Sequence, residues 1–243
     1  MAQNIYDDPT FFAGYSGLPR SVDGLAAAPE WPALRALLPD MTGLRVVDLG
    51  CGFGWFCRFA REAGAARVLG LDISERMLTR ARGETRDNGI TYERADLEHL
   101  DLPQAVFDLA YSSLALHYVE DLGRLFATVH RALVPGARFV FSIEHPIFMA
   151  SRRPGWITDA EGHKSWPVDS YHLEGPRRTD WLAEGVLKYH RTLGTTLNLL
   201  IRNGFAIRHV EDFAPSEADI AARPDLAEER ERPMFLLVAA DRA

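Results

Sequence analysis

The 243-residue sequence contains only two cysteines and no long apolar run, and each shortage excludes a class of protein. Two cysteines are too few for a disulfide framework or for the three or more ligands of an iron–sulfur cluster. No run of about 18 apolar residues occurs, so we expect no membrane-spanning helix and no membrane partner. Residues 1–12 include Asp7 and Asp8 and no basic stretch, so no signal peptide is expected. We therefore expect a cytoplasmic globular protein.

Basic residues and metal-ligand patterns are also scarce. The 27 Lys and Arg residues against 34 Asp and Glu leave a formal net charge of −7. A nucleic-acid-binding surface usually needs an excess of basic side chains, so we expect no nucleic-acid partner. The eight histidines form no His-x-His or His-x₃-His pair, and Cys51 and Cys57 have no neighbouring ligands. We therefore expect no metal site.

The sequence does contain short β-branched runs that alternate with helical patterns, which is typical of βαβ units and a parallel sheet. The predicted strands are residues 44–49, 67–73, 90–94, 106–112, 137–144, 205–213 and 233–240. Seven strands with helices between them predict an α/β fold with an open, doubly wound, mostly parallel sheet.

Apolar spacing and end signals predict four helices in the same region. One follows the first strand and ends at Gly64, and the next begins after Ser74, a plausible N-cap. A third ends at Pro135-Gly136 and a fourth ends at Gly204. The proline-containing residues 1–43 are expected to form an irregular arm with one short helix near residues 31–38.

Residues 145–195 differ in composition from the rest of the chain. They hold three of the five tryptophans and seven basic against six acidic residues. We therefore divide the chain into the arm, residues 1–43, a core, residues 44–144, an inserted segment, residues 145–195, and a C-terminal part of the same sheet, residues 196–243.

The sharpest motif is VVDLGCGFG, residues 46–54, in which a strand ends in Asp48 and three glycines follow at alternate positions. Glycines allow a tight turn and close approach of a ligand to the N–H groups of the next helix. Asp72 ends the second strand, where an acidic side chain can accept hydrogen bonds from ribose hydroxyls, and Asp96 follows the third. Trp55 and Phe56 would crowd a pyrophosphate. A nucleoside without phosphates fits better, and S-adenosylmethionine is such a ligand.

The runs VVDLGCGFG, LGLDIS, ADLEHL and FDLAYSSLALHYVED resemble the motifs of class I S-adenosylmethionine-dependent methyltransferases. The type 11 methyltransferase domain of the ubiquinone/menaquinone-biosynthesis group is the most similar, and residues 44–144 carry most of the likeness. The resemblance implies the strand order 3-2-1-4-5-7-6 with the last strand antiparallel. It also implies S-adenosylmethionine as cofactor, S-adenosylhomocysteine as product, and a small molecule as methyl acceptor.

The resemblance further implies a role for each motif residue. The glycines would line the methionine part and the ribose, with Asp48 beneath the loop, and Asp72 would hold the ribose hydroxyls. Asp96 and Leu97 would bind the adenine edge, and the carbonyl of Ser112 would lie near the methionine amine. The remaining cofactor-binding positions are Gly50, Gly52, Gly54, Ile73 and Met77 and, in an arm that covers the cofactor, Tyr15 and Arg20.

The acceptor side is less defined. His117, His145 and, with less support, His190 could accept a proton near neutral pH, whereas a structural role for His117 is the alternative. The inserted segment is expected to form a lid around an aromatic or anionic acceptor, with Arg177 and Arg178 as the basic candidates. In the alternative, its tryptophans only pack the lid onto the sheet and its arginines pair with neighbouring acidic residues.

Two other functions stay open at this point, a nicotinamide-dependent oxidoreductase and a non-catalytic S-adenosylmethionine-binding protein. The first is disfavoured by Trp55 and by the lack of a Tyr-x-x-x-Lys pair. We expect a monomer or a homodimer.

Overall fold

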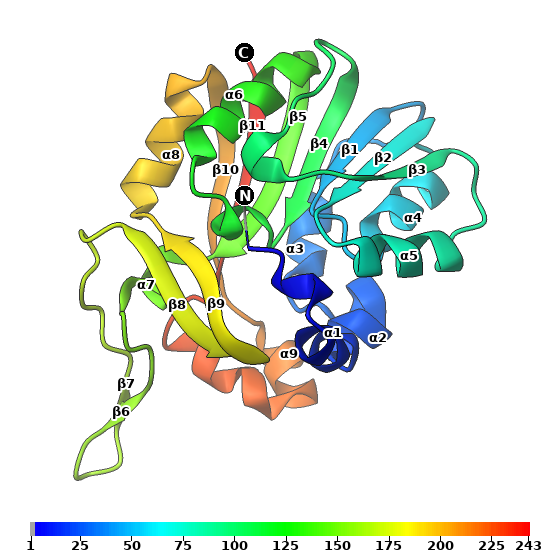
Figure 1. The fold of residues 1–243 in the computed structure, drawn as a ribbon. Helices are drawn as coiled ribbons and strands as arrows, with labels where there is room; N and C mark the ends of the chain where they lie inside the picture. The colour runs from blue at the N-terminus through cyan, green and yellow to red at the C-terminus, as the bar shows by residue number, and fades with distance from the viewer. Residues whose placement is uncertain (1–2) are drawn as a thin grey trace.

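The computed structural model describes residues 3–243, and its centre is a single seven-stranded sheet (Figure 1). The order across the sheet is β10-β11-β5-β4-β1-β2-β3, and β11 is antiparallel to both of its neighbours. The other strands run in one direction, which confirms the predicted fold class and the order that the resemblance implied. The strands are β1 Arg45–Leu49, β2 Arg67–Asp72, β3 Ile90–Arg94, β4 Phe107–Ser113, β5 Leu133–Glu144, β10 Phe205–Phe213 and β11 Phe235–Arg242.

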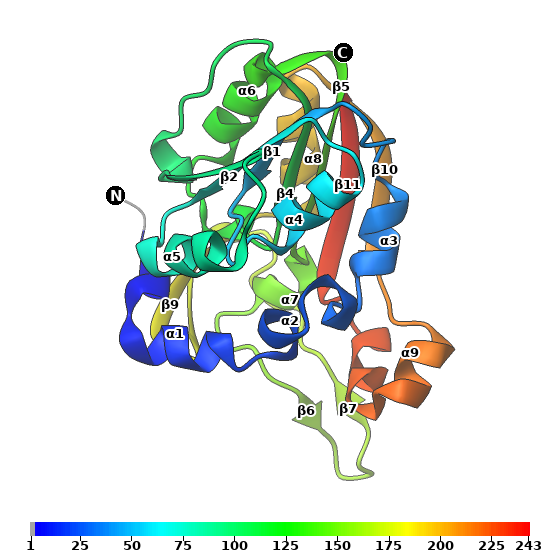
Figure 2. The same cartoon turned by 90° about the vertical axis from the view of Figure 1, so that its right-hand side faces the viewer.

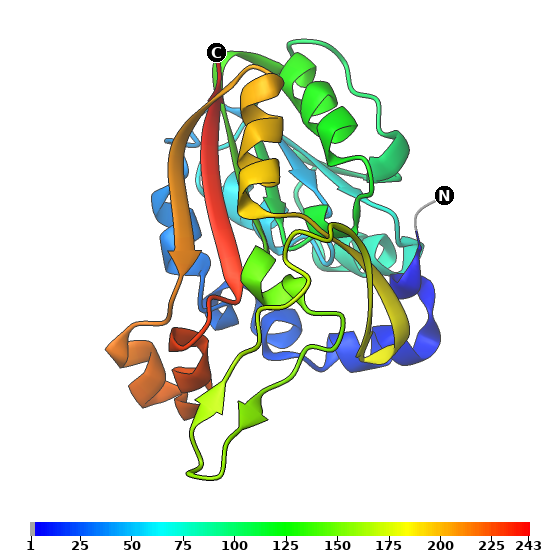
Figure 3. The ribbon, with the colours of Figure 1, turned by 90° about the vertical axis from the view of Figure 1, so that its left-hand side faces the viewer.

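Helices cover both faces of the sheet because successive strand residues point to opposite sides. Val46 packs on the face covered by α3 (Trp31–Ala36), α4 (Trp55–Glu62) and α5 (Glu75–Glu84). Val47 packs on the opposite face with α6 (Leu122–Ala132) and α8 (Leu193–Arg202). Helices α3 and α4 lie toward the viewer in Figure 2, and α6 and α8 in Figure 3.

The predicted strand ends agree with the structure to within two residues except at the start of β5. Strand β5 begins at Leu133, so Pro135-Gly136 lies within the strand, and α6 ends earlier, at Ala132. Leu133 is fully buried and pairs with Phe107, and the register then shifts before Leu109 pairs with Arg138. The shift accommodates Pro135 and Gly136, so a turn-like dipeptide here marks an irregularity in a strand and not a helix end.

The N-terminal arm is helical, and the prediction of an irregular arm is wrong. It contains η1 (Ile5–Asp7), α1 (Pro9–Ser16), α2 (Pro19–Val22) and η2 (Gly24–Ala27) before α3. Proline disrupts the interior of a helix, yet Pro9 and Pro19 occupy first turns, where the missing N–H needs no partner. Asp8 caps α1 by accepting from the N–H groups of its first turn.

The remaining elements gather at the carboxyl ends of the parallel strands, below the sheet in Figure 1. The inserted segment forms two hairpins, and the others are short helices at strand ends or in the C-terminal part. Their bounds are η3 Leu97–His99, η4 Leu116–Tyr118, α7 Pro146–Ala150, β6 Ile157–Thr158, β7 Lys164–Ser165, β8 Gly175–Trp181, β9 Ala183–His190, α9 Glu217–Ala222 and η5 Pro224–Arg230. Ligands of open α/β sheets bind at this edge. Within residues 3–243, no helix is both long and apolar enough to cross a bilayer.

Candidate functional site

A cavity of about 620 Å³ lies at the carboxyl edge of the sheet. Its wall includes the N-terminal helices, the ends of β1, β2, β4 and β5, the β8–β9 hairpin, and residues 223–235. This volume lies within the range of ligand sites that enclose a small molecule. The arm, the core, the inserted segment and the C-terminal part therefore all contribute to one site.

The glycine loop after β1 forms part of the floor of this cavity. Gly50 and Gly52 line it, and Gly52 has a φ of +52°. A Cβ at Gly52 would meet no atom within 4 Å, so a side chain there would project into open space. Gly54 does not line the cavity; a Cβ at Gly54 would lie 2.1 Å from Tyr92 Oη, so this glycine allows the loop to pack against β3.

Asp72 joins the glycine loop to the end of β2. Its Oδ2 accepts from the Gly52 N–H at 2.8 Å, and its Oδ1 accepts from the Ser74 N–H at 2.9 Å. Burial raises the pKa of Asp72 to about 6, against the opposing effect of these hydrogen bonds. Asp72 lines the cavity at 9% exposure, beside Ile73 and Met77. The structure thus brings four of the predicted cofactor residues together, Gly52, Asp72, Ile73 and Met77.

Asp48 lies deeper, at the end of β1. It accepts a hydrogen bond from Cys57 Sγ at 3.3 Å, and burial raises its pKa to about 7. Asp96 and Leu97 line the cavity where β3 leads into η3, and Asp96 caps that turn. Ser112 is fully buried and donates from Oγ to the Leu49 carbonyl, so it lies behind the wall that the next residue, Ser113, lines.

Tyr15 and Arg20 reach the cavity from the arm. Arg20 Nη2 donates to both oxygens of Glu30, at 2.8 and 3.0 Å, and Glu30 is only 1% exposed. Burial opposes the charge of Arg20, but Glu30 outweighs it and raises the Arg20 pKa. Sequence reasoning missed Glu30, because nothing in its local pattern indicates a buried partner for Arg20.

Unpartnered polar atoms in this part of the wall fit a polar nucleoside ligand. Among the described residues, Trp55 Nε1, Tyr111 Oη and Ser21 Oγ are buried without a hydrogen-bond partner, and all three residues line the cavity. Buried polar atoms without partners are uncommon in folded proteins, so this part of the wall has hydrogen-bonding capacity that the protein itself does not use. Together with the open space in front of Gly52, these atoms fit the predicted cofactor.

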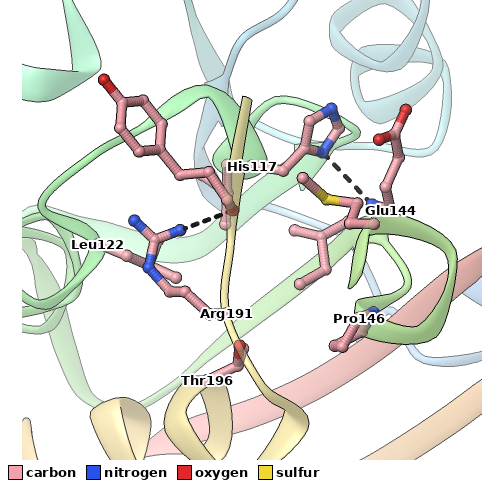
Figure 4. A pocket seen from close by; sticks show the side chains of 10 residues that line it. His117, Leu122, Glu144, Pro146, Arg191 and Thr196 are labelled. Atoms are coloured by element: carbon pink, nitrogen blue, oxygen red, sulfur yellow. Dashed lines mark hydrogen bonds between the residues drawn. The ribbon is translucent and has the colours of Figure 1, made fainter. Parts of the chain in front are cut away.

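The three candidate histidines have different surroundings. His117 lines the cavity, and its Nδ1 accepts from the Glu144 N–H at 3.3 Å, so its proton is on Nε2 (Figure 4). Burial, followed by the charges of Lys188 and Arg191, holds the His117 pKa well below its ordinary value. His117 is therefore a neutral hydrogen-bond donor, and its geometry supports the structural alternative over a general base.

His145 and His190 lie outside the cavity wall. His145 Nδ1 accepts from the Ile147 N–H, and Nε2 pairs with Asp212 at 2.8 Å, so both ring nitrogens are engaged. Burial lowers the His145 pKa despite that carboxylate. His190 Nε2 bonds the Tyr171 carbonyl. Neither histidine is placed to reach a ligand.

A small second cavity of about 10 Å³, enough for one water molecule, lies behind His117 and Glu144 (Figure 4). Its wall also contains Arg191, which donates to the carbonyls of Val119 and Glu120, both at 2.6 Å. The loop after β4 is therefore tied to the end of β9. This arrangement fixes the backbone on which His117 stands.

The inserted segment contributes a buried ion pair that sequence reasoning missed. Lys188 Nζ on β9 lies 2.5 Å from Glu144 Oε1 at the end of β5, and the two side chains are 4% and 14% exposed. Both line the cavity, and the rings of Trp181 and Tyr118 lie 5.2 and 5.9 Å from Lys188 Nζ. The buried side of β9 includes the polar residues Lys188 and His190, so no apolar alternation marks this strand in the sequence, and no strand was predicted there.

The predicted basic and aromatic groups of this segment are divided between the cavity and the protein interior. The Arg177 guanidinium donates to backbone carbonyls, including those of Ala150 and Leu173 at 2.9 and 2.8 Å. Arg178 is exposed. Trp181 lines the cavity, whereas Trp156 and Trp166 do not; they lie against the Arg232 guanidinium, with ring centroids 5.4 and 4.2 Å away. Neither arginine pairs with an acidic side chain among residues 3–243.

Comparison with known proteins identifies the family. Residues 47–141 match a methyltransferase domain family. The crystal structure of an S-adenosylmethionine-dependent methyltransferase from Mesorhizobium loti is 70% identical, covers 90% of this chain and 100% of that chain, and superposes with a TM-score of 0.88. An uncharacterized protein of Haemophilus influenzae is 34% identical over 217 residues, which are 86% of this chain and 85% of that protein.

A malonyl-[acyl-carrier protein] O-methyltransferase of Pectobacterium atrosepticum is 38% identical over 109 residues, which cover 45% of this chain and only 42% of that protein.

Fold, site and sequence therefore define a class I methyltransferase. The chain belongs to the S-adenosylmethionine-dependent methyltransferases, so its cofactor is S-adenosylmethionine. The nicotinamide-dependent alternative is not supported. The roles given to individual cofactor residues stay predictions.

Proposed function

We propose that this methyltransferase transfers a methyl group to a small molecule held in the main cavity, and releases S-adenosylhomocysteine. The observation that carries the proposal is one connected space between the Gly50–Gly52 loop and the β8–β9 hairpin. A sulfonium methyl group is already activated, so the protein contributes chiefly by aligning donor and acceptor and by excluding water. A cavity shared by donor and acceptor serves both purposes.

We propose that the cofactor lies across the strand ends in the order of the sheet. Asp96 and Leu97 after β3 would bind adenine, Asp72 at the end of β2 the ribose, and Gly52 after β1 the methionine part. The adjacent strand ends, those of β4 and β5, then face the methyl group. The acceptor would lie between these ends and the β8–β9 hairpin.

We propose an uncharged or cationic acceptor with an apolar or aromatic body. Eight acidic and four basic side chains line the cavity, so its field favours positive charge. Of the two basic groups on the hairpin side, Arg177 is engaged by carbonyls and Lys188 is neutralised by Glu144. An anionic acceptor, one of the two kinds that the sequence left open, would therefore find no free cation on this side of the cavity. Trp181, Tyr118 and Phe148 supply apolar wall.

The test compares two glycines with similar backbone conformations. Gly52 and Gly136 both have positive φ, +52° and +77°, and a Cβ at either would meet nothing within 4 Å. Only Gly52 lines the cavity. Gly52→Val should weaken S-adenosylhomocysteine binding at least about tenfold by calorimetry, while Gly136→Val retains it at a similar loss of stability. Equal affinities in the two variants would contradict the proposed cofactor position. The cytoplasmic location and the monomer or homodimer remain predictions.

A further inference from the structure

The Glu144–Lys188 ion pair lies in the wall of the main cavity, and burying its two charges contributes little to the stability of the fold. Both side chains are almost entirely withdrawn from water, and their Nζ and Oε1 atoms are 2.5 Å apart. Desolvation of two charges offsets much of their attraction, and apolar replacements of buried pairs are often equally stable. The pair also joins β5, a strand of the main sheet, to β9 of the inserted hairpin. Stability alone therefore does not account for two charges at this position.

Glu144 has a free carboxylate oxygen. Its Oε1 accepts from Lys188, and among residues 3–243 no donor bonds its Oε2. The other acidic side chains of the wall outside the proposed cofactor end are engaged or exposed. Glu98 accepts from two backbone N–H groups, Glu30 and Glu229 each pair through both oxygens with an arginine, and the Asp225 side chain is 71% exposed.

Glu144 also stands at the right place along the sheet. It ends β5, which is two strands from β1 and its glycine loop, on the side away from Asp72. With strands about 4.8 Å apart, its backbone lies about 10 Å from the end of β1, and its side chain spans part of that interval. The neighbouring His117 presents its Nε2–H and accepts from the Glu144 N–H. A proton acceptor and a neutral donor therefore stand side by side.

We propose that Glu144 accepts the proton of the methyl acceptor, that Lys188 positions its carboxylate, and that the acceptor is therefore a hydroxyl or amine nucleophile. This inference rests on the proposed function. The bond between sulfur and the methyl carbon breaks with its electron pair left on sulfur, as the carbon bonds to the acceptor oxygen or nitrogen. The acceptor O–H or N–H bond breaks, and its proton moves to Glu144 Oε2 and later to water.

The test uses phenol and benzylamine as probe acceptors and anisole, which has no transferable proton, as the negative probe. Transfer is followed with S-adenosylmethionine carrying a tritiated methyl group. Wild type should methylate phenol or benzylamine but not anisole. Glu144→Gln should lower kcat at least about 100-fold, the usual contribution of a general base, with S-adenosylhomocysteine affinity within twofold. Glu161→Gln, on the exposed β6–β7 turn, is the matched control and should retain full transfer.

Lys188→Met should lower kcat more than it raises KM for the probe, and Lys188→Arg should restore part of kcat. Because Glu144→Gln leaves Lys188 charged and unpaired, the double variant Glu144→Gln/Lys188→Met removes both charges and tests the loss of transfer in a neutral pocket. Methylation of neither probe by wild type, or a Glu144→Gln rate within threefold of wild type, would overturn the inference. Failure of wild type to bind S-adenosylhomocysteine would instead overturn the proposed function.

Discussion

Asp72 offers the most direct test of where the adenosine part of the cofactor binds. Each of its oxygens already accepts one backbone hydrogen bond, from Gly52 and from Ser74. A carboxylate has about four lone-pair sites, so about two remain for the two ribose hydroxyls. Loss of this charged contact in Asp72→Ala should cost about 1.5–3 kcal/mol of binding free energy, or about 10- to 150-fold in affinity.

The assay is isothermal titration calorimetry with S-adenosylhomocysteine and with its 2′,3′-dideoxy analogue. In wild type, removal of the two hydroxyls from the ligand should cost the same about 1.5–3 kcal/mol. In Asp72→Ala their removal should cost less than about 0.5 kcal/mol, because the partner is already absent. The difference between these two costs is the coupling energy between the Asp72 side chain and the ribose hydroxyls, and it does not include any effect of the substitution on the glycine loop.

Asp87→Ala is the matched control. Like Asp72, Asp87 accepts a hydrogen bond from the N–H of a glycine, here Gly89 at 2.6 Å, but Asp87 does not line the cavity. Its loss should leave the affinity for both ligands unchanged. An Asp72→Ala affinity within twofold of wild type, or an undiminished cost of removing the hydroxyls in that variant, would refute the placement of the ribose.

Three further predictions follow from burial and charge. Because the Asp72 pKa is about 6 and the ionised form is the acceptor, calorimetry should show S-adenosylhomocysteine affinity falling about tenfold from pH 8 to pH 5 in wild type but not in Asp72→Asn. Burial raises the Asp48 pKa from 3.8 to about 7, so ionisation of Asp48 destabilises the fold as the pH rises through that range. In urea unfolding, the free energy of unfolding of Asp48→Asn relative to that of wild type should therefore increase by about 2–3 kcal/mol from pH 5 to pH 8. A difference between the two proteins that does not change with pH would contradict this. Arg177→Gln should lower the free energy of unfolding by about 1.5–3 kcal/mol, because the contacts of Arg177 with backbone carbonyls are lost. Arg178 is exposed, so Arg178→Gln should lower it by less than about 0.5 kcal/mol. Equal losses in the two variants would contradict the structural role of Arg177.

The sheet and the cofactor end were predictable because local chemistry and global position agree there. Val46 and Val47 belong to the continuous apolar run of a strand that is buried on both faces, and the glycines mark the turn that follows. Asp72 and Asp96 could be placed at one site without a structure, because the carboxyl ends of parallel strands meet at one edge.

The helical arm was missed for a different reason. Pro9 and Pro19 are compatible with a helix only in its first turn, and the sequence does not show in advance where that turn begins.

The acceptor end escaped prediction because its buried side chains are polar. On the inner face of the β8–β9 hairpin, Arg177 lies opposite Lys188, and His190 follows two residues on. Apolar alternation detects strands that face a hydrophobic core, and these residues face carbonyls, a carboxylate and a ligand cavity instead. Local sequence rules are expected to fail most where side chains serve function rather than packing. Glu144 and Lys188 are 44 positions apart in the sequence, and the fold of the β8–β9 hairpin brings them into contact. Their pairing is therefore the feature of the proposed acceptor site that only the three-dimensional structure reveals.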